Sequence, residues 1–298
     1  MTTNFASTSD TAWTRPILAF SDTFHDTSFF FGTFQGMVHG ESERYSRRKY
    51  DYVNPMLVFC DLHRELIEEF QDIAIVTGGP VAPYLRQLMR IRERDPKIDP
   101  ANFPPLPLGH PYLVKNFGLP ASRNDTPAAR ALVKHLLRED VTIHICGHHA
   151  CHAANAYYSS SFRDALVVTL DGVGFDFVPQ SEAVNVIPLS RKIPEQQVYG
   201  SVFVCRDNNI SLKHQLKAFS IGWMWTRVVT EALGLKDGEE GTAMAMAALG
   251  DPIRFRRHID VDCASYPGPG IQTDDQKARL ADWISTLNQN IVTDQDRY

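Results

Sequence analysis

The chain has 298 residues, enough for one large domain or two modest ones. Hydrophobic residues make up 43% and charged residues 22%, an ordinary globular composition that excludes a disordered chain. A broad nucleic-acid surface carries a basic excess, so the formal net charge of -5 argues against such a partner.

The ends of the chain and its cysteines indicate a cytoplasmic protein with no membrane partner. Residues 1–15 are polar, read as a flexible lead-in, and lack the apolar core of a secretory signal. The longest apolar runs, such as Phe29 to Phe31, are far too short to span a membrane. Five dispersed cysteines fit reduced thiols better than a disulfide framework.

Hydrophobic periodicity and turn residues predict strands and helices in alternation. In chain order we expect a strand at Ile17–Phe20, one or two strands in Thr27–Val38 with turns at Gly32 and Gly36, a helix at Pro55–Phe70, a strand at Asp72–Thr77, a proline-rich loop at Asp95–Pro111, a helix at Pro127–Arg138, a strand at Val141–Ile145, a helix through Ala153–Tyr158, strands at Ala165–Leu170, Asp176–Leu189 and Val198–Val204, and a helix at Phe219–Leu233 closed by Gly234.

Two stretches of the chain share one pattern. Ile17–Gly36 and Ala165–Val186 each read as a strand, a polar turn and a further strand. The first turn contains His25-Asp26, and the second contains Asp171-Gly172. A twofold repeat of a sheet-and-helix unit is the plan of the actin-like, sugar-kinase-like fold, which belongs to the α/β class.

A histidine cluster follows the strand predicted before residue 146. If a helix starts there, His148 and His152 lie one turn apart on one face, with Cβ atoms about 6 Å apart, so that both imidazoles can bind one metal ion. Asp171 ends the next predicted strand, nineteen residues after His152, and offers a carboxylate as third ligand. The pattern predicts a divalent metal site.

Cys146 and Cys151 flank the same cluster and leave two other interpretations open. They could hold a structural zinc ion, although their spacing is loose and no second cysteine pair follows. They could equally be small buried packing residues, which is the usual role of free cysteine.

Four segments, in order, resemble the O-carbamoyltransferases of nodulation-factor and antibiotic biosynthesis. GHHACHAANAYYSSSFRDALVVTLDGVG resembles that family's His-His-x-x-His-Ala segment followed by a strand and Asp-Gly. Residues 17–51 resemble its opening, with a His-Asp-Ser turn and then Glu-Arg-Phe-Ser-Arg-x-Lys-His-Asp. SIGWMWTRVVTEALGL resembles its Ser-Leu-Gly helix, and EEGTAMAMAALGDP resembles its Glu-x-Lys-x-Met-Gly-Leu-Ala-x-Tyr-Gly-Asp-Pro loop.

The resemblance implies a fold and a reaction. Residues 16–298 would form the first lobe and part of the second lobe of an actin-like carbamoyltransferase domain, truncated and without the family's C-terminal YrdC-like domain. In the family, the YrdC-like domain makes carbamoyl-adenylate from carbamoyl phosphate and ATP. The actin-like domain then passes the carbamoyl group to a hydroxyl of a small-molecule or oligosaccharide acceptor.

The resemblance also implies roles for individual residues. His148, His152 and Asp171 would bind a divalent metal, with iron expected and zinc the alternative. His25 and Lys49 would be catalytic residues at the transfer site. The residues implied for binding the nucleotide are Arg47, Gly172 and Gly174.

The chain also departs from the family pattern. Thr242 and Ala245 stand where the family has lysine and glycine, and the chain stops at Tyr298, before the rest of the second lobe. The sequence leaves three alternatives open: a fragment, a truncated gene, or a split subunit whose missing half a separate chain would supply. In each case we expect no transferase activity from the isolated chain and uncovered apolar surface near Trp283.

Two other functions remain open. One is a catalytically inactive remnant that binds nucleotide and metal, which the truncation and the altered 239–252 segment support. The other is a relative of the tRNA threonylcarbamoyl-adenosine synthases, which share the His-x-x-x-His pattern. The His-Asp-Thr turn and the ESERYSRRKYD segment favour the carbamoyltransferase over that relative.

Overall fold

A computed structural model describes residues 15–22, 27–33, 36–47, 54–99, 102–104, 126–179, 184–217, 220–222, 225–226, 232–236, 239–250 and 273–290. The chain divides into two compact units. The first contains Met1–Cys151 and Phe177–Glu195, and the second contains His152–Asp176 and Gln196–Tyr298.

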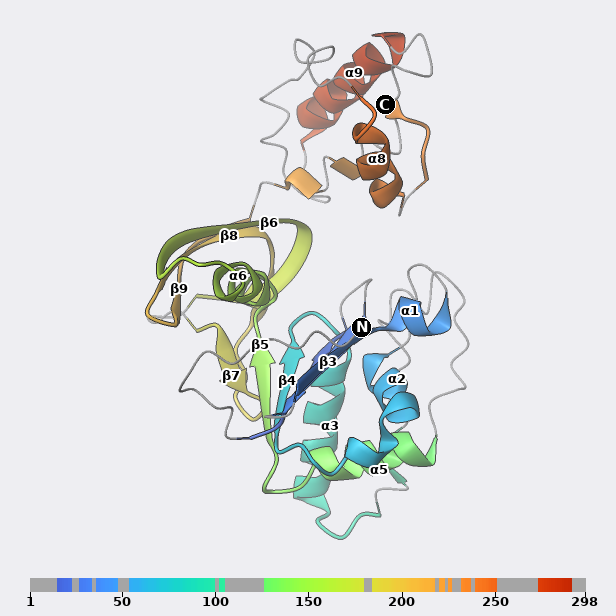
Figure 1. The fold of residues 1–298 in the computed structure, drawn as a ribbon, viewed down its shortest axis with the longest axis vertical. Helices are drawn as coiled ribbons and strands as arrows, with labels where there is room; N and C mark the ends of the chain where they lie inside the picture. Colours follow the sequence, from blue (N-terminus) through green and yellow to red (C-terminus); the bar gives the residue numbers. More distant parts are fainter. Residues whose placement is uncertain are drawn as a thin grey trace. The chain divides into compact units, whose positions relative to one another are not determined.

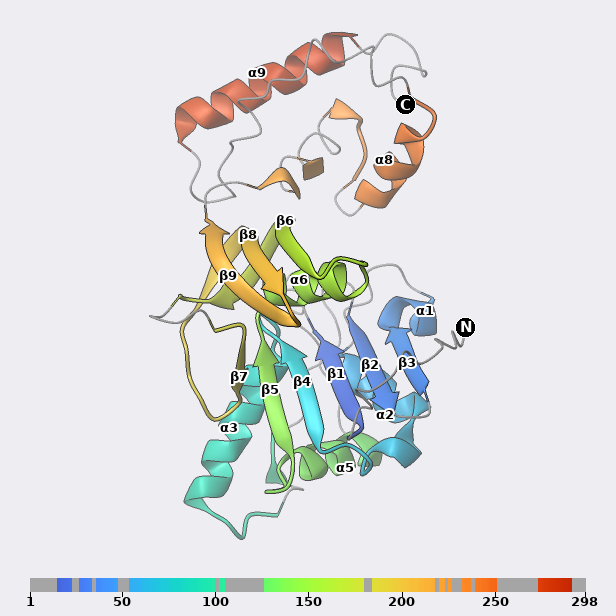
Figure 2. The ribbon, with the colours of Figure 1, turned by 60° about the vertical axis from the view of Figure 1, so that its left-hand side comes forward.

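A mixed six-stranded sheet is the centre of the first unit, with the strand order β3-β2-β1-β4-β5-β7 (Figure 2). Strands β1 to β3 pair antiparallel, β1, β4 and β5 pair parallel, and β7 returns antiparallel to β5. The strand bounds are β1 Ile17–Ser21, β2 Ser28–Thr33, β3 Gly36–Glu41, β4 Asp72–Val76, β5 Thr142–Cys146 and β7 Val186–Pro188.

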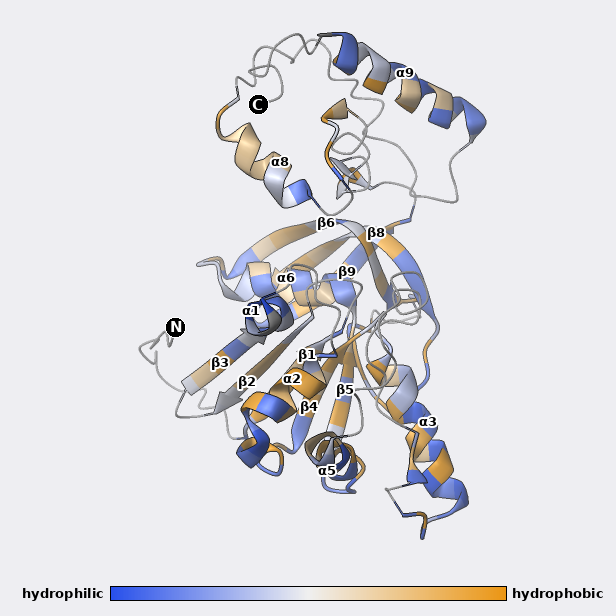
Figure 3. Ribbon diagram, turned by 90° about the vertical axis from the view of Figure 1, so that its right-hand side faces the viewer, coloured by the Kyte–Doolittle hydropathy of each residue, from blue (hydrophilic) through white to orange (hydrophobic). Residues whose placement is uncertain are grey.

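Helices α2, α3 and α5 lie together on one face of this sheet, as two views show (Figures 1 and 3). The helices described in or entering this unit are α1 Ser42–Ser46, α2 Pro55–Leu62, the 3₁₀ turn η1 Arg64–Leu66, α3 Val81–Arg94, α5 Pro127–Leu136 and α6 His148–Tyr158. Helices α2 and α5 start with the same kind of N-cap. Asn54 and Thr126 accept hydrogen bonds from the backbone N–H groups of the first turns of α2 and α5, and a proline follows each cap.

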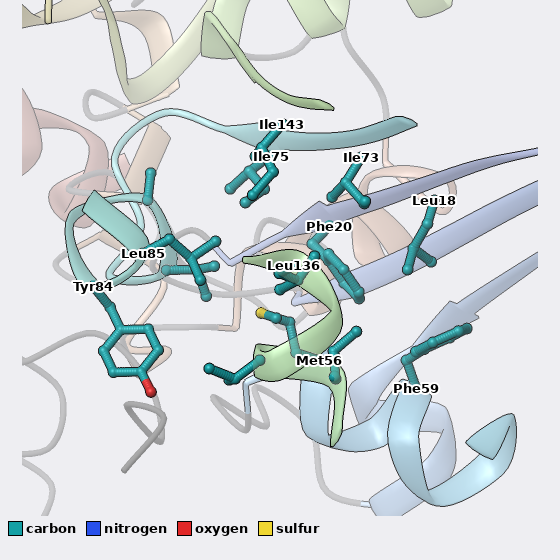
Figure 4. Close-up of a cluster of buried hydrophobic side chains, with 14 of the residues drawn as sticks. Leu18, Phe20, Met56, Phe59, Ile73, Ile75, Tyr84, Leu85, Leu136 and Ile143 are labelled. Carbon is teal, nitrogen blue, oxygen red and sulfur yellow. The ribbon is translucent and has the colours of Figure 1, made fainter. Parts of the chain in front are cut away.

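One face of the sheet forms the hydrophobic core because buried and half-exposed residues alternate along its strands. Leu18 and Phe20 on β1, and Ile73 and Ile75 on β4, are each 1% exposed or less. They pack towards the helices with Met56, Phe59, Leu85 and Leu136 (Figure 4). The two-residue period of a strand therefore fixes which face the helices cover.

The second unit is built on a three-stranded sheet of order β6-β8-β9. Its strands are β6 Asp164–Phe177, β8 Glu195–Arg206 and β9 Asn209–Leu216, and its described helices include α8 Glu240–Ala247 and α9 Asp274–Asn290. β8 and β9 form an antiparallel hairpin whose two linking residues, Asp207 and Asn208, have φ of 47° and 63°. Asp and Asn tolerate this left-handed conformation, which two-residue hairpins prefer. Within the described residues, no helix is long and apolar enough to cross a membrane.

The structure confirms the α/β class and most of the predicted elements. β1, β4, β5 and α5 lie within two residues of their predicted bounds. The predicted helix at Phe219–Leu233 is helical at Ile221, Gly222, Trp225, Thr226 and Ala232, and Gly234 has the left-handed φ of 66° that a C-cap requires.

Five predictions of secondary structure are wrong. The helix predicted to reach Phe70 ends at Leu62 and is followed by η1, and Gly32 lies inside β2 rather than in a turn. β6 does not end at Asp171 but continues to Phe177, and the strand predicted to reach Leu189 is reduced to the short β7. The segment predicted as a loop at residues 239–252 forms α8 over Glu240–Ala247.

Candidate metal centre

The carboxyl ends of the parallel strands β1, β4 and β5 meet at one edge of the first sheet, which is where open α/β sheets bind ligands. Asp22 follows β1, Thr77 follows β4, and Gly147 and His148 follow β5. The Thr77 Oγ1 accepts a hydrogen bond of 3.0 Å from the His148 backbone N–H. The Gly147 N–H donates to the Asn185 carbonyl at 2.9 Å. These contacts fix the point where α6 leaves the sheet.

Helix α6 begins at His148, as the metal-site prediction requires. His148 and His152 are therefore one helical turn apart, and one ligand atom each from His148, His152 and Asp171 lies within 4.8 Å of the others. The His152 Nε2 is 3.5 Å from Asp171 Oδ2. His148 and Asp171 are half-buried and His152 is exposed, so solvent and small ligands reach the group.

This donor set fits a divalent transition metal. Two imidazole nitrogens and one carboxylate oxygen are the ligands of many catalytic metal sites, which keep a further position open for water or substrate. All three residues can present one atom to a common point, because their ligand atoms lie within 4.8 Å of one another.

A Ser-x-Gly segment holds the backbone that carries Asp171. The Ser220 Oγ is within hydrogen-bonding distance of the Asp171 carbonyl at 3.1 Å and the Gly172 carbonyl at 2.8 Å. Gly222 lies so close to Gly172 that a Cβ on it would overlap the Gly172 backbone N. The Gly172 N–H in turn donates to Asp171 Oδ1 at 2.5 Å. Sequence reasoning noted the segment as part of the resemblance but did not predict this contact.

His149, Cys146 and Cys151 lie close in sequence to the two candidate histidine ligands but outside the three-ligand group. His149 is fully buried, and its ring meets that of His148 edge-on at a centroid distance of 5.4 Å. Cys146 and Cys151 share a side-chain hydrogen bond that lowers the pKa of the Cys146 thiol. In the part of the chain that the structure describes, no cysteine belongs to a group of three metal-binding side chains.

Asp22 is a buried carboxyl group at the end of β1 that the sequence did not reveal. Its carboxylate is 3% exposed, and Oδ2 accepts a 2.7 Å hydrogen bond from the Val81 N–H at the start of α3. Among the residues that the structure describes, none is a hydrogen-bond partner of its buried Oδ1, and a Cβ at Gly79 would overlap the carboxylate. Burial raises the pKa of Asp22 to about 7, against the lowering effect of the Val81 hydrogen bond.

The remaining predicted site residues are placed as follows. Arg47 is exposed and ends α1 in a left-handed conformation with φ of 60°. Gly172 is half-buried next to Asp171, and Gly174 is buried farther along β6. His25 and Lys49 lie outside the described residues.

The fold and this group define an α/β protein with a candidate His-x-x-x-His and Asp metal centre. Residues 45–261, well over half of the chain, match the family described as carbamoyltransferase N-terminus. The chain therefore belongs to the carbamoyltransferase family. This match includes all three side chains of the candidate centre.

One relative comes from the archaeon Methanocaldococcus jannaschii, the uncharacterized protein MJ1058. It is 34% identical to this chain over 145 residues, which cover 47% of this chain and 22% of the relative. The matched region is thus less than a quarter of that relative's length.

Proposed function

We propose that this chain contributes the metal-binding part of an O-carbamoyltransferase of the type found in nodulation-factor and antibiotic biosynthesis. The reaction transfers a carbamoyl group from carbamoyl-adenylate, made from carbamoyl phosphate and ATP, to a hydroxyl of a small-molecule or oligosaccharide acceptor. The observation that carries this proposal is the meeting of His148, His152 and Asp171 inside the stretch that matches the carbamoyltransferase family.

The strand order supports a proposed actin-like fold. In the first sheet an antiparallel series, β1-β2-β3, is extended on the free side of β1 by the parallel strands β4 and β5. The order β6-β8-β9 in the second sheet repeats β1-β2-β3. Residues 16–298 would accordingly form one actin-like lobe and the start of another.

The proposed metal is iron, with zinc as the alternative, bound by His148, His152 and Asp171. When bound, such an ion stabilises negative charge that develops on the carbamoyl and phosphate oxygens. The protein's part is positional: α6 holds the two imidazoles one turn apart, and Ser220 and Gly222 fix the backbone of Asp171.

The proposed transfer uses other side chains of this chain. The acceptor hydroxyl oxygen attacks the carbamoyl carbon, the bond from that carbon to the phosphate oxygen breaks, and AMP leaves. His25 takes the hydroxyl proton, because an imidazole has an unperturbed pKa near neutrality. Lys49 and Arg47 offset the charge of the phosphate, and the backbone at Gly172 and Gly174 lies against the nucleotide.

A second candidate function is a remnant that binds nucleotide and metal without catalysis. Thr242 and Ala245 favour it, because a lysine and a glycine of the family pattern are absent there. Both residues are exposed on α8, so neither was replaced to complete a hydrophobic core.

Binding of a donor analogue tests the proposal. A stable sulfamate analogue of carbamoyl-adenylate is titrated calorimetrically into the metal-loaded chain and into a His152→Ala variant. We expect saturable binding to the wild type that is at least tenfold weaker in the variant, since one metal ligand is lost. Equal binding by both proteins, or none by either, contradicts the proposed donor site.

A further inference from the structure

The thiols of Cys146 and Cys151 occupy two positions that meet at the start of a helix. The Cys151 N–H donates to the Gly147 carbonyl at 3.0 Å, so Gly147 is the cap and His148 the first helical residue of α6. Cys146 is then the residue before the cap, and Cys151 is the fourth residue of the helix. Side chains at these two positions commonly pack together as a hydrophobic staple. Here they interact directly through a side-chain hydrogen bond.

Both backbones that carry these thiols are held in place. Cys146 pairs with Val76 on one side and Val186 on the other, and its carbonyl accepts a 2.8 Å hydrogen bond from the Thr77 N–H. Cys151 lies within α6. Two reactive groups that the fold already holds in contact react with each other far faster than with groups on other molecules.

Exposure distinguishes this pair from the other described cysteines. Cys146 and Cys151 are half-buried, so small molecules can reach them. Cys60 and Cys205 are each 1% exposed, and burial raises the pKa of the Cys60 thiol to about 12. A small oxidant therefore meets two adjacent accessible thiols and two inert ones among the described residues.

We propose that Cys146 and Cys151 form a redox-active dithiol, which small disulfides such as oxidised glutathione convert to an intramolecular disulfide across the first turn of α6. One cysteine thiolate attacks the oxidant's disulfide, forms a mixed disulfide and releases one glutathione thiolate. The second cysteine attacks the protein sulfur of that mixed disulfide and releases the other. The two protein thiols lose two electrons and two protons, and the oxidant is reduced to two thiols.

The Cys146–Cys151 disulfide would also affect the candidate metal centre, a consequence that rests on the proposed function. The sulfur atoms must approach to about 2.05 Å, which draws the first turn of α6 towards the end of β5. His148 lies inside the ring of residues that the bond closes, and His152 lies outside it. Their relative position therefore changes, and disturbances around metal ligands weaken binding on the order of tenfold or more.

Thiol counting tests the dithiol itself. The full chain is equilibrated with increasing ratios of oxidised to reduced glutathione, unfolded, alkylated and digested with trypsin. We expect the peptide Glu139–Arg163 to lose two alkylation sites and two hydrogen masses, without bound glutathione. Cys205→Ala, the control, should behave the same. Cys151→Ser should instead accumulate a glutathione adduct on Cys146. Alkylation of both thiols at every ratio, or crosslinks between chains, overturns the proposal.

Metal titration tests the coupling. The affinity for Co²⁺ is measured for the reduced chain, the oxidised chain, and a Cys146→Ser/Cys151→Ser variant with and without oxidant. We expect about tenfold weaker binding after oxidation of the wild type and no effect of oxidant on the variant, which has neither thiol. Equal affinity before and after oxidation overturns the coupling but leaves the dithiol. If the reduced chain binds no metal, the proposed function fails while the thiol-counting result stands.

Discussion

Asp22 places a carboxyl group inside the protein next to the edge of the sheet where the candidate metal centre lies. Burial raises its pKa from 3.8 to about 7, so the native state favours the neutral form. A carboxyl with a raised native pKa contributes stability that is present below pH 3.8 and is lost as the pH rises to about 7.

Replacing Asp22 with Asn should therefore stabilise the protein at pH 8. Asn keeps an oxygen that can accept from the Val81 N–H and removes the buried charge. We expect the free energy of unfolding to rise by roughly 1–4 kcal/mol at pH 8, with the gain shrinking towards pH 5. Urea unfolding at both pH values is the measurement. Asp140→Asn, which alters an exposed carboxyl beside Arg138, is the control, and a loss of stability at pH 8 in Asp22→Asn would refute the account.

Gly222 should matter because its lack of a side chain lets Gly172 approach. In Gly222→Ala the new Cβ would overlap the Gly172 backbone, so the neighbouring Asp171 must move. We expect metal affinity to fall at least tenfold, measured by Co²⁺ titration. Ile221→Ala, next to it and 39% exposed, should retain wild-type affinity. Unchanged affinity in Gly222→Ala would mean that this contact does not position Asp171.

Strand β6 exposes apolar side chains on one of its two faces. Leu166, Val168 and Leu170 point to one face and are 68%, 52% and 47% exposed, whereas Val167 on the other face is 9% exposed. Apolar surface was also expected near Trp283, which is partly buried against Leu280 and Ile284. The exposed stripe lies on β6.

This stripe should promote self-association of the purified chain. Val168→Lys, on the exposed face, should lower the association constant without loss of stability, measured by sedimentation equilibrium and thermal unfolding. Val167→Lys, the matched change on the buried face, should unfold the protein. A wild-type chain that stays monomeric at high concentration would contradict this expectation.

At the level of elements, the sequence predicted those strands and helices whose bounds are set by local residue patterns. β4, β5 and α5 have clear periodicity bounded by glycine, proline or polar residues, and their predicted bounds were nearly right. β6 was cut short because Asp171-Gly172 reads as a turn. Ser220 and Gly222, some fifty residues later, bind that backbone. No local pattern contains that contact.

In the candidate site too, local patterns were predictable and contacts between distant residues were not. His148 and His152 were predictable because a helix brings residues four apart together. Asp22 was not, because its burial depends on Gly79 and Val81, which only the fold brings to the end of β1. α3 was missed because it starts at Val81, directly after Gly78-Gly79-Pro80, a sequence that is typical of the end of an element.

For the molecule as a whole, metal binding and the complete carbamoyl transfer are separate properties that can be tested apart. The matching family model describes the N-terminal part of a carbamoyltransferase. We therefore expect these 298 residues alone to yield no carbamoylated product by mass spectrometry when given ATP, carbamoyl phosphate and a panel of sugars. Addition of a separately expressed YrdC-like domain together with the remaining actin-like lobe of a family enzyme should restore product. Turnover by the chain alone at an enzymatic rate would show that these residues contain the whole catalytic apparatus.

The central claim is that His148, His152 and Asp171 bind one metal ion, and elemental analysis of the purified protein tests it most directly. The wild type, a His148→Ala/His152→Ala variant and a His63→Ala/His144→Ala control are loaded with Fe²⁺ or Zn²⁺ and desalted. The control loses two histidines outside the group. We predict about one ion per chain in the wild type and control, and less than about a tenth of that in the His148→Ala/His152→Ala variant. Equal metal content in all three proteins would contradict the claim.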